Sequence, residues 1–294
     1  MSEKKSVNNT ETKEKRPSAI EIQYQISKRM EKVKHKIAVI SGKGGVGKTT
    51  IAVNIAYGLR KIGKTVGLCD VDITGPMVPK MLHLEDKHPP IDQSSEKIFP
   101  VEGPLGLKVL SMAFFLKNPD DAVIWRGPMK MSFTRQMLSD FEWGELDYLI
   151  FDLPPGTGDE ILDILQLIPE VKIIIVSTPQ EVSVLDARKT IGMTRTMKRD
   201  FLGLIENMSG FICPHCGLET SIFGQGGARK AAGELGVPFL GGVPFELATR
   251  EGGDTGIPVI NNETTEGSKI FSRIVAKIQE ELENEKLVKK DDSN

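Results

Sequence analysis

The stretch Ser-Gly-Lys-Gly-Gly-Val-Gly-Lys-Thr-Thr, residues 41–50, decides the fold of this chain. It follows a short apolar run, 37–41, and opens a segment, 49–59, whose apolar residues recur at helical spacing. Gly42 and the triplet Gly47-Lys48-Thr49 match the pattern G-x-x-x-x-G-K-[S/T] in this strand-to-helix setting. Glycines let backbone N–H groups face a phosphate, and the helix N-terminus adds the positive end of its dipole. The stretch therefore predicts a phosphate-binding loop within an α/β fold.

Three side chains of this loop have distinct expected roles toward a nucleoside triphosphate. Lys48 neutralises β- and γ-phosphate oxygens, Thr49 supplies a ligand to Mg²⁺, and Thr50 reaches the α-phosphate. The expected nucleotide-binding residues of the loop are Gly42, Lys43, Gly44, Gly45, Val46, Gly47, Lys48, Thr49 and Thr50.

Beyond the loop, apolar strand-like runs alternate with segments of helical spacing. Continuous apolar strands separated by helices are typical of a parallel sheet that is covered on both faces. The sequence thus predicts an α/β fold with a doubly wound, mostly parallel sheet and helices on both faces. The expected strands are 37–41, 65–70, 107–112, 148–152, 172–178, 201–207 and 238–243, and the expected helices include 49–59, 161–168, 182–197, 228–235 and 264–283.

The pattern divides the chain into four parts. Residues 1–19 are polar and without periodicity, which predicts a disordered arm, and 20–35 predict an amphipathic helix. No internal repeat or Gly/Pro/Ser-rich linker interrupts 36–284, so a single P-loop NTPase domain is expected there. Residues 285–294 form a charged tail. Within the domain, 80–106 lack a clear period and predict an insertion over the sheet edge.

Composition excludes several classes of protein. The 294 residues include 38 Lys+Arg and 40 Asp+Glu, a net charge of −2, which gives no prior for a polyanion-coating protein. Three cysteines are too few for a disulfide-stapled secreted scaffold. No apolar run reaches the ~18–20 residues of a membrane span, and the N-terminus shows no apolar signal segment. We therefore expect a cytoplasmic protein.

Acidic residues end two of the expected strands. Asp152 ends the run 148–151, as expected of a Walker B carboxylate that holds Mg²⁺ through water. Asp70 and Asp72 end the run 65–70 in the same way. Because ligands gather at the carboxyl ends of parallel strands, these carboxylates are expected to converge on the phosphate-binding loop. The turn that follows Asp152, 153–159, is suited to sensing a γ-phosphate.

Lys43, directly after the first glycine, makes the loop resemble the deviant Walker A motif of the MinD/ParA/nitrogenase-iron-protein class. The resemblance implies that Lys43 contacts nucleotide across a dimer interface and neutralises charge in the transition state. It further implies that Asp72 orients the attacking water and that Asp70 supports the metal shell. The implied catalytic residues are Lys43, Lys48, Asp72 and Asp152, and the implied Mg²⁺ residues are Thr49, Asp70 and Asp152. By the same resemblance Asn207 reads the adenine edge, with Pro244 and Phe245 as a wall for the base.

Cys213 and Cys216 form a Cys-Pro-His-Cys pair in a loop after the strand 201–207. Four interpretations stay open from the residues: a redox dithiol, a structural zinc site, an iron–sulfur site, or two thiols without a ligand. A metal site needs about four ligands, and the third cysteine, Cys69, is expected to pack as a small hydrophobe at a strand end. A two-fold dimer would bring two such pairs together and supply four thiolates, which suit a bridging [4Fe–4S] cluster.

Taken together, several ordered motifs make the chain similar to the Mrp/ApbC family of iron–sulfur cluster carrier ATPases, with a MinD-like (SIMIBI) fold. They are GKGGVGKTT, CDVDITGPMVPKML, VIWRGPMKM, YLIFDLPPGTGDE, STPQEVSVLDARK, GLIENMSGFICPHCG, FGQGGARK and GGVPF. The resemblance implies a homodimer that binds ATP and Mg²⁺, hydrolyses ATP slowly and holds a labile [4Fe–4S] cluster on Cys213 and Cys216. It implies apo iron–sulfur proteins, and scaffold proteins, as partners. The arm lacks the extra cysteines of eukaryotic cytosolic relatives, which favours the short prokaryotic type.

Two other functions compete with the carrier. A spatial-organisation ATPase of the MinD/ParA kind needs a terminal membrane helix or a basic DNA-binding face, whereas residues 280–285 are acidic. We therefore expect no nucleic-acid or membrane partner. A reductase like the nitrogenase iron protein carries a cluster cysteine after Walker B, and 153–164 contain none.

Overall fold

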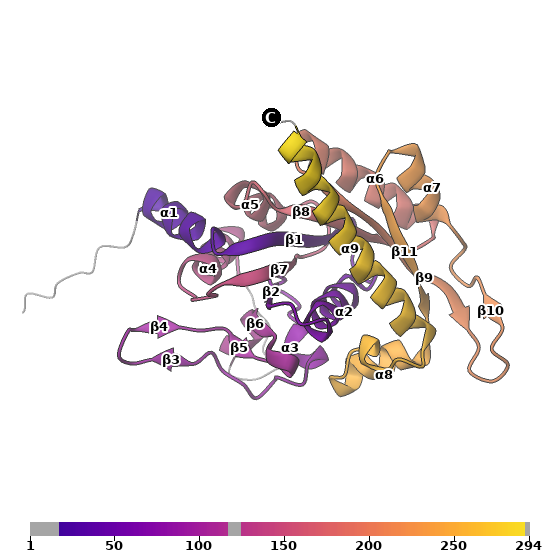
Figure 1. Ribbon diagram of the computed structural model, residues 1–294, viewed down its shortest axis with the longest axis horizontal. Coiled ribbons are helices and arrows are strands. Elements are labelled where there is room, and N and C mark those ends of the chain that lie inside the picture. Colours follow the sequence, from indigo (N-terminus) through magenta and orange to yellow (C-terminus); the bar gives the residue numbers. More distant parts are fainter. Residues whose placement is uncertain (1–17, 117–124, 292–294) are drawn as a thin grey trace, which may run out of the picture.

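The computed structural model describes residues 18–116 and 125–291 and contains one large sheet (Figure 1). Its strands are β1 Val33–Ser41, β2 Val66–Asp70, β5 Val101–Glu102, β6 Lys108–Ser111, β7 Leu146–Asp152, β8 Lys172–Ser177, β9 Phe201–Ile212, β10 Glu219–Thr220 and β11 Phe239–Phe245. They are ordered β10-β9-β8-β1-β7-β2-β6-β5, and β11 pairs with β9. Within this sheet, as far as the described residues go, only the pairs β5–β6 and β10–β9 are antiparallel.

Helices cover both faces of this sheet. They are α1 Ala19–Met30, α2 Lys48–Lys61, α3 Val78–Met81, α4 Gly127–Ser139, α5 Asp159–Leu167, α6 Glu181–Thr196, α7 Gly227–Glu234, α8 Leu247–Thr255 and α9 Glu266–Asp291. One buried cluster joins α2 and α9 to the sheet, and a second joins α1, α4, α5, α6 and α7 to it. Figure 1 shows α9 lying across the front of the sheet. The predicted doubly wound, mostly parallel fold is confirmed.

The register of the central strands sets up the site. β1 lies between β7 and β8, so the phosphate-binding loop leaves the sheet from a central strand. On β2 and β7, Asp70 and Asp152 are direct register partners. Both carboxylates therefore lie at the same carboxyl edge, next to the start of α2.

The N-terminal helix is shorter than the predicted 20–35. A capping box at Ser18 and Glu21 starts α1, and the helix ends at Met30. Val33 already belongs to β1, where it is buried and pairs with Leu146 of β7. Tertiary strand pairing therefore overrides the helical spacing of the apolar residues. Of the expected arm, residues 1–17 lie outside the described residues.

Two further elements extend beyond their predicted ends. β9 continues past 207 to Ile212 and then forms a hairpin with β10, which projects at the right of Figure 1. α9 continues to Asp291, so the expected charged tail begins inside a helix. The stretch 80–106 places a small hairpin, β3 Ile91–Asp92 with β4 Lys97–Ile98, and the edge strand β5 beside the sheet.

Candidate functional site

The phosphate-binding loop depends on glycine at several positions. Gly45 and Gly47 have φ of 79° and 80°, in the left-handed region that residues with a Cβ seldom adopt. Gly42 is required for a different reason, because a Cβ there would lie 2.5 Å from the backbone of Asp186 on α6. The loop is thus held against α6 at its beginning and turned toward α2 at its end.

Lys48 and Thr49 converge on Asp152, although more than a hundred residues separate them in the chain. Lys48 Nζ lies 2.6 Å from Asp152 Oδ1, and Thr49 Oγ1 donates to Asp152 Oδ2 at 2.7 Å. The side chains of Lys48 and Asp152 are almost fully buried. A hydroxyl and a carboxylate in contact, beside a buried ammonium, form a donor set that fits Mg²⁺ and phosphate oxygens. The roles assigned to these residues stay predictions.

Asp70 is fully buried beside this pair. Its Oδ2 accepts from Ser111 Oγ at 2.9 Å and from the Val78 N–H at 3.2 Å. Burial and, after it, repulsion from the Asp152 carboxylate raise the pKa of Asp70 to about 8, against the lowering effect of Lys48. Asp70 is therefore braced by protein groups, and a role in the metal shell stays a prediction.

Asp72 lies just beyond the end of β2. Its Oδ1 accepts from Thr74 Oγ1 at 3.0 Å and from the Gly75 N–H at 3.3 Å, so the carboxylate caps its own turn. Its backbone N–H donates to Asp70 Oδ1 at 3.2 Å, which links the backbone of Asp72 to the Asp70 carboxylate. The expected role of Asp72 toward water stays a prediction.

Asn207 contacts the phosphate-binding loop directly. Its Nδ2 donates to the Val46 carbonyl at 2.8 Å, and a Cβ on Gly47 would lie 2.2 Å from the same nitrogen. Pro244 is buried at the end of β11, and the ring of the next residue, Phe245, lies 6.1 Å from the ring of Phe211. The adenine roles of Asn207 and Pro244 stay predictions.

Lys43 is half-buried and precedes the exposed Gly44 and Gly45. Ser41 Oγ donates to the Lys43 carbonyl at 2.9 Å and fixes the backbone there. Its predicted action across a dimer interface requires a second copy of the chain.

Cys213 and Cys216 occupy the turn of the β9–β10 hairpin. Cys213 is half-buried and Cys216 is exposed, and the Cys213 N–H donates to the Leu218 carbonyl at 3.0 Å. Hydrogen bonds from the backbone of Cys216 and His215 lower the pKa of the Cys213 thiol. Cys69, by contrast, is completely buried, and burial raises the pKa of its thiol well above the ordinary range. Among the described residues, no three His, Cys, Asp or Glu side chains are grouped to hold a metal ion.

The structure adds residues that the sequence analysis missed. Ser111, at the end of β6, braces Asp70, and Glu206 accepts from the Gly226 and Ala228 N–H groups at the start of α7. Lys130 on α4 pairs with Glu160 at 3.1 Å, just after the turn expected to sense a γ-phosphate. Ser111 could have been found from the sequence, because it is a hydroxyl residue at the carboxyl end of an apolar strand. No sequence pattern indicates that Lys130 pairs with Glu160.

The chain matches the family described as "ParA: NUBPL iron-transfer P-loop NTPase" over residues 32–279. It belongs to this family. An iron–sulfur cluster carrier protein of Methanocaldococcus jannaschii is 49% identical over 89% of this chain and 90% of its own length. The iron–sulfur cluster transfer protein NUBPL of Dictyostelium discoideum is 44% identical over 89% and 81%.

Solved structures share the fold of this chain. A nucleotide-binding protein of Archaeoglobus fulgidus, in complex with ADP, is 36% identical with a TM-score of 0.71, over 81% of this chain and 92% of that one. The cell-division ATPase MinD of Pyrococcus furiosus is 21% identical with a TM-score of 0.61, over 84% and 99%, and shares the fold. The MinD/ParA alternative therefore rests on structural likeness alone.

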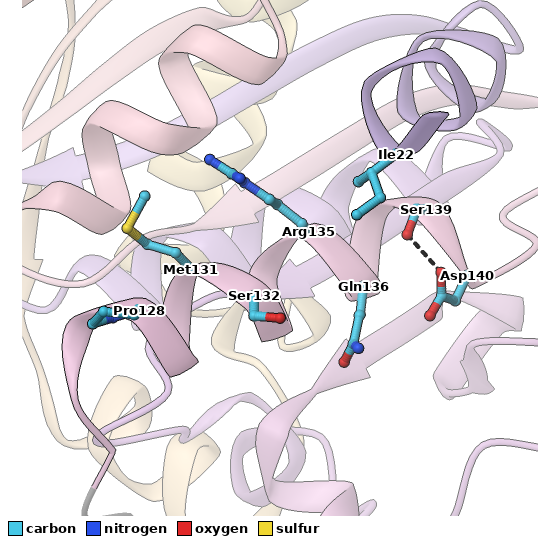
Figure 2. Close-up of a pocket in the computed structure, with 8 residues that line it drawn as sticks. All are labelled: Ile22, Pro128, Met131, Ser132, Arg135, Gln136, Ser139 and Asp140. Atoms are coloured by element: carbon cyan, nitrogen blue, oxygen red, sulfur yellow. Dashed lines mark hydrogen bonds between the residues drawn. The ribbon is translucent and has the colours of Figure 1, made fainter. Parts of the chain in front are cut away.

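A cavity of about 780 Å³ lies between α1 and α4 of this NUBPL-type NTPase, away from the predicted site residues. Figure 2 shows Ile22 of α1 facing it across a row of side chains on α4, among them Arg135 and Gln136. Arg135 also pairs with Asp163 of α5 at 2.6 Å, which ties α4 to α5 on the same face of the sheet. Among the described residues, no helix combines the length and the apolar character that crossing a membrane requires.

Proposed function

We propose that this protein is an ATP-dependent iron–sulfur cluster carrier that works as a homodimer. The iron–sulfur cluster is its cargo, held between two copies by Cys213 and Cys216 of each, and passed to apo-proteins. ATP hydrolysis is slow and coupled to cluster carriage. The names of relatives that are 44–49% identical over most of the chain support this proposal.

One structural observation carries it. Strand β9 bears Asn207, which contacts the phosphate-binding loop, and leads directly into the thiol pair at its tip. A change at the loop therefore has a short covalent path to the cysteines. Switches driven by nucleotide hydrolysis use such local changes to bias a larger element.

The number of thiols supports the dimer. One chain provides two cysteines at the hairpin and a third that is buried elsewhere, whereas a [4Fe–4S] cluster takes about four thiolates. Two hairpins related by a two-fold axis supply that number. The lowered pKa of Cys213 favours the thiolate, the form that binds iron.

Hydrolysis of ATP at the nucleotide site would provide the free energy for cluster transfer. Lys48, Thr49 and Asp152 would hold ATP with Mg²⁺, which when bound provides phosphoryl-transfer chemistry. Lys43 would reach the nucleotide of the partner copy, so hydrolysis would require the dimer. Asp72 would hold a water near the loop.

The cargo is tested by anaerobic reconstitution with iron and sulfide. We expect the wild type to bind about four irons per dimer, and Cys213→Ala and Cys216→Ala to lose the cluster absorption. Cys69→Ala is the matched control, since it removes a thiol distant from the hairpin. If either hairpin variant still binds the wild-type amount of iron, the proposed cargo site is wrong.

The coupling is tested with Lys48→Ala. Removal of the buried ammonium is expected to abolish ATP hydrolysis and cluster delivery while leaving cluster assembly intact. Delivery is followed by the regained activity of an apo iron–sulfur enzyme incubated with the loaded carrier. Undiminished delivery by Lys48→Ala would show that ATP and cluster transfer are independent.

A further inference from the structure

Strand β11 forms an open edge of the sheet. Among the described residues it pairs with β9 and with no other strand. Its Phe239 carbonyl accepts instead from a side chain, Lys277 Nζ of α9, at 3.3 Å. An edge strand presents backbone donors and acceptors to which another extended chain can pair.

A cavity of about 540 Å³ lies along the first half of this edge. Its floor is apolar and formed by Phe239, Leu240 and the glycines at 241 and 242, together with Ile270 and Ile274 of α9. A Cβ at Gly241 would lie 3.0 Å from the Ile274 side chain, so glycine there lets α9 pack closely on the strand. A cavity of this volume beside a strand edge that no other described strand occupies can admit an extended segment.

Three exposed cations surround the cavity. Arg229 reaches it from α7, on one side of the sheet, and Arg273 and Lys277 reach it from α9, on the other. The Arg229 guanidinium carbon lies 4.7 Å from the centre of the Phe239 ring, which fixes its position over the strand. Among the described residues that line the cavity, none is acidic.

In the described part of the molecule, none of Arg229, Arg273 and Lys277 forms a close ion pair, whereas the neighbouring Lys230 and Lys269 pair with Glu234 and Glu266. Arg273 acts on Glu266 only as a nearby charge, which contributes, after the hydrogen bond from Lys269, to lowering the pKa of that carboxyl. Lysines at a sheet edge discourage pairing with ordinary strands. The same charges select for a strand that carries carboxylates.

We propose that the open edge of β11 binds an extended, acidic segment of a partner protein by strand addition. Backbone hydrogen bonds to β11 supply the affinity, and ion pairs with Arg229, Arg273 and Lys277 supply the selectivity. The surface lies toward the amino end of β11, whereas the nucleotide residues and the thiols lie at the carboxyl ends of the strands. The proposal goes beyond cluster carriage and requires neither nucleotide nor cluster.

The test uses the full-length protein and a labelled ten-residue peptide of alternating Glu and Val, capped at both ends. We expect saturable binding by fluorescence anisotropy that weakens with salt, and slower hydrogen exchange at residues 239–242. Arg273→Glu with Lys277→Glu, and separately the milder Arg273→Gln with Lys277→Gln, should weaken binding about tenfold or more. Lys269→Glu, on the same helix but outside the cavity, should change it little.

Two further probes separate strand addition from charge attraction. A peptide of the same sequence, N-methylated at alternate residues, keeps its charge but cannot pair, and should lose binding. If the methylated peptide binds as well as the unmethylated one, strand addition is wrong. If a ten-nucleotide oligothymidylate binds and the peptide does not, the partner is not an acidic protein segment. ATP hydrolysis by the Arg273 and Lys277 variants should equal that of the wild type. A failure of the peptide test therefore leaves the carrier function untouched, and a failure of the carrier tests leaves the peptide site untouched.

Discussion

At the scale of single residues, the site depends on close approach as much as on charge. Asp152 contacts Lys48 at 2.6 Å and Thr49 at 2.7 Å, so a shorter side chain at any of the three positions would lose its contact. Gly42 allows the loop to contact the backbone of α6. The motif pattern specifies a glycine at this position, and the contact with α6 gives the reason for it.

The first prediction concerns Gly42→Ala. The added Cβ would lie 2.5 Å from the backbone of Asp186, so the loop or α6 must shift. We expect a loss of about 1–3 kcal/mol in the free energy of unfolding, measured with urea. Gly44→Ala is the control, since its Cβ would meet only Pro155 at 3.8 Å, and should change stability by less than about 0.5 kcal/mol. Equal stability of the two variants would contradict the packing argument.

At the scale of elements, side chains at the amino ends of the central strands set how these strands meet. Asp147 on β7 accepts from Lys34 of β1 at 2.7 Å and from the backbone and hydroxyl of Thr65, both at 2.8 Å. Hydrogen bonds from Lys34 and Thr65 lower the pKa of this carboxyl well below its ordinary value. Asp147 thus joins β7 to β1 and to the start of β2. This contact lies at the amino ends of the strands, whereas the nucleotide residues lie at their carboxyl ends.

The second prediction is a pH dependence at Asp147. Because the pKa is lower in the folded protein than the unfolded value of about 3.9, the stabilisation is complete above that pH and is lost as pH falls through the folded-state pKa. Asp147→Asn should lower the unfolding free energy at pH 7 by about 1 kcal/mol, after allowance for solvent screening. The gap from wild type should narrow below about pH 4.

Urea unfolding at a series of pH values measures this gap. Glu145→Gln is the matched control, since Glu145 is exposed and acts on Lys34 only as a nearby charge; it should change the unfolding free energy by less than about 0.5 kcal/mol at every pH. A gap that stays constant down to pH 3 would show that the charge of Asp147 contributes nothing.

At the scale of the whole molecule, one chain supplies only part of each site that the proposed function requires. The thiol pair is at the tip of a projecting hairpin, and Lys43 is half-buried in the phosphate-binding loop. In the proposed function, both would become complete sites when a second copy faces the first. The same edge of the sheet would then form the interface.

The third prediction tests whether Lys43 acts on the partner's nucleotide. Lys43→Ala and Lys48→Ala should each be inactive in ATP hydrolysis. When equal amounts are mixed and allowed to exchange, half of the dimers combine the two variants and contain one intact site. Activity should then recover to about a quarter of the wild-type value. Without recovery after exchange, shown by mass spectrometry of tagged chains, Lys43 would act within its own chain.

Much of the fold was predictable because its signals are local. The strands 37–41 and 148–152 and the helix 49–59 follow from spacing over a few residues, and each lies within an observed element. The helix expected over 20–35 was too long, because Val33 pairs with a strand more than a hundred residues away. The strand expected over 201–207 was too short, since β9 continues to Ile212. Met208 has a φ of 56°, which bends the chain at that point but does not end the strand.

The sequence by itself determined the phosphate-binding loop, the alternation of strands and helices, and the pair of cysteines, since each depends on neighbours in the chain. Only the tertiary structure decided that Lys48 contacts Asp152, that Ser111 braces Asp70 and that Asn207 contacts the loop. It also left β11, among the described residues, with a strand on one side alone and with Arg229, Arg273 and Lys277 beside its other edge. The physical reason is that register and packing join segments far apart in the chain, and no local spacing encodes which ones meet.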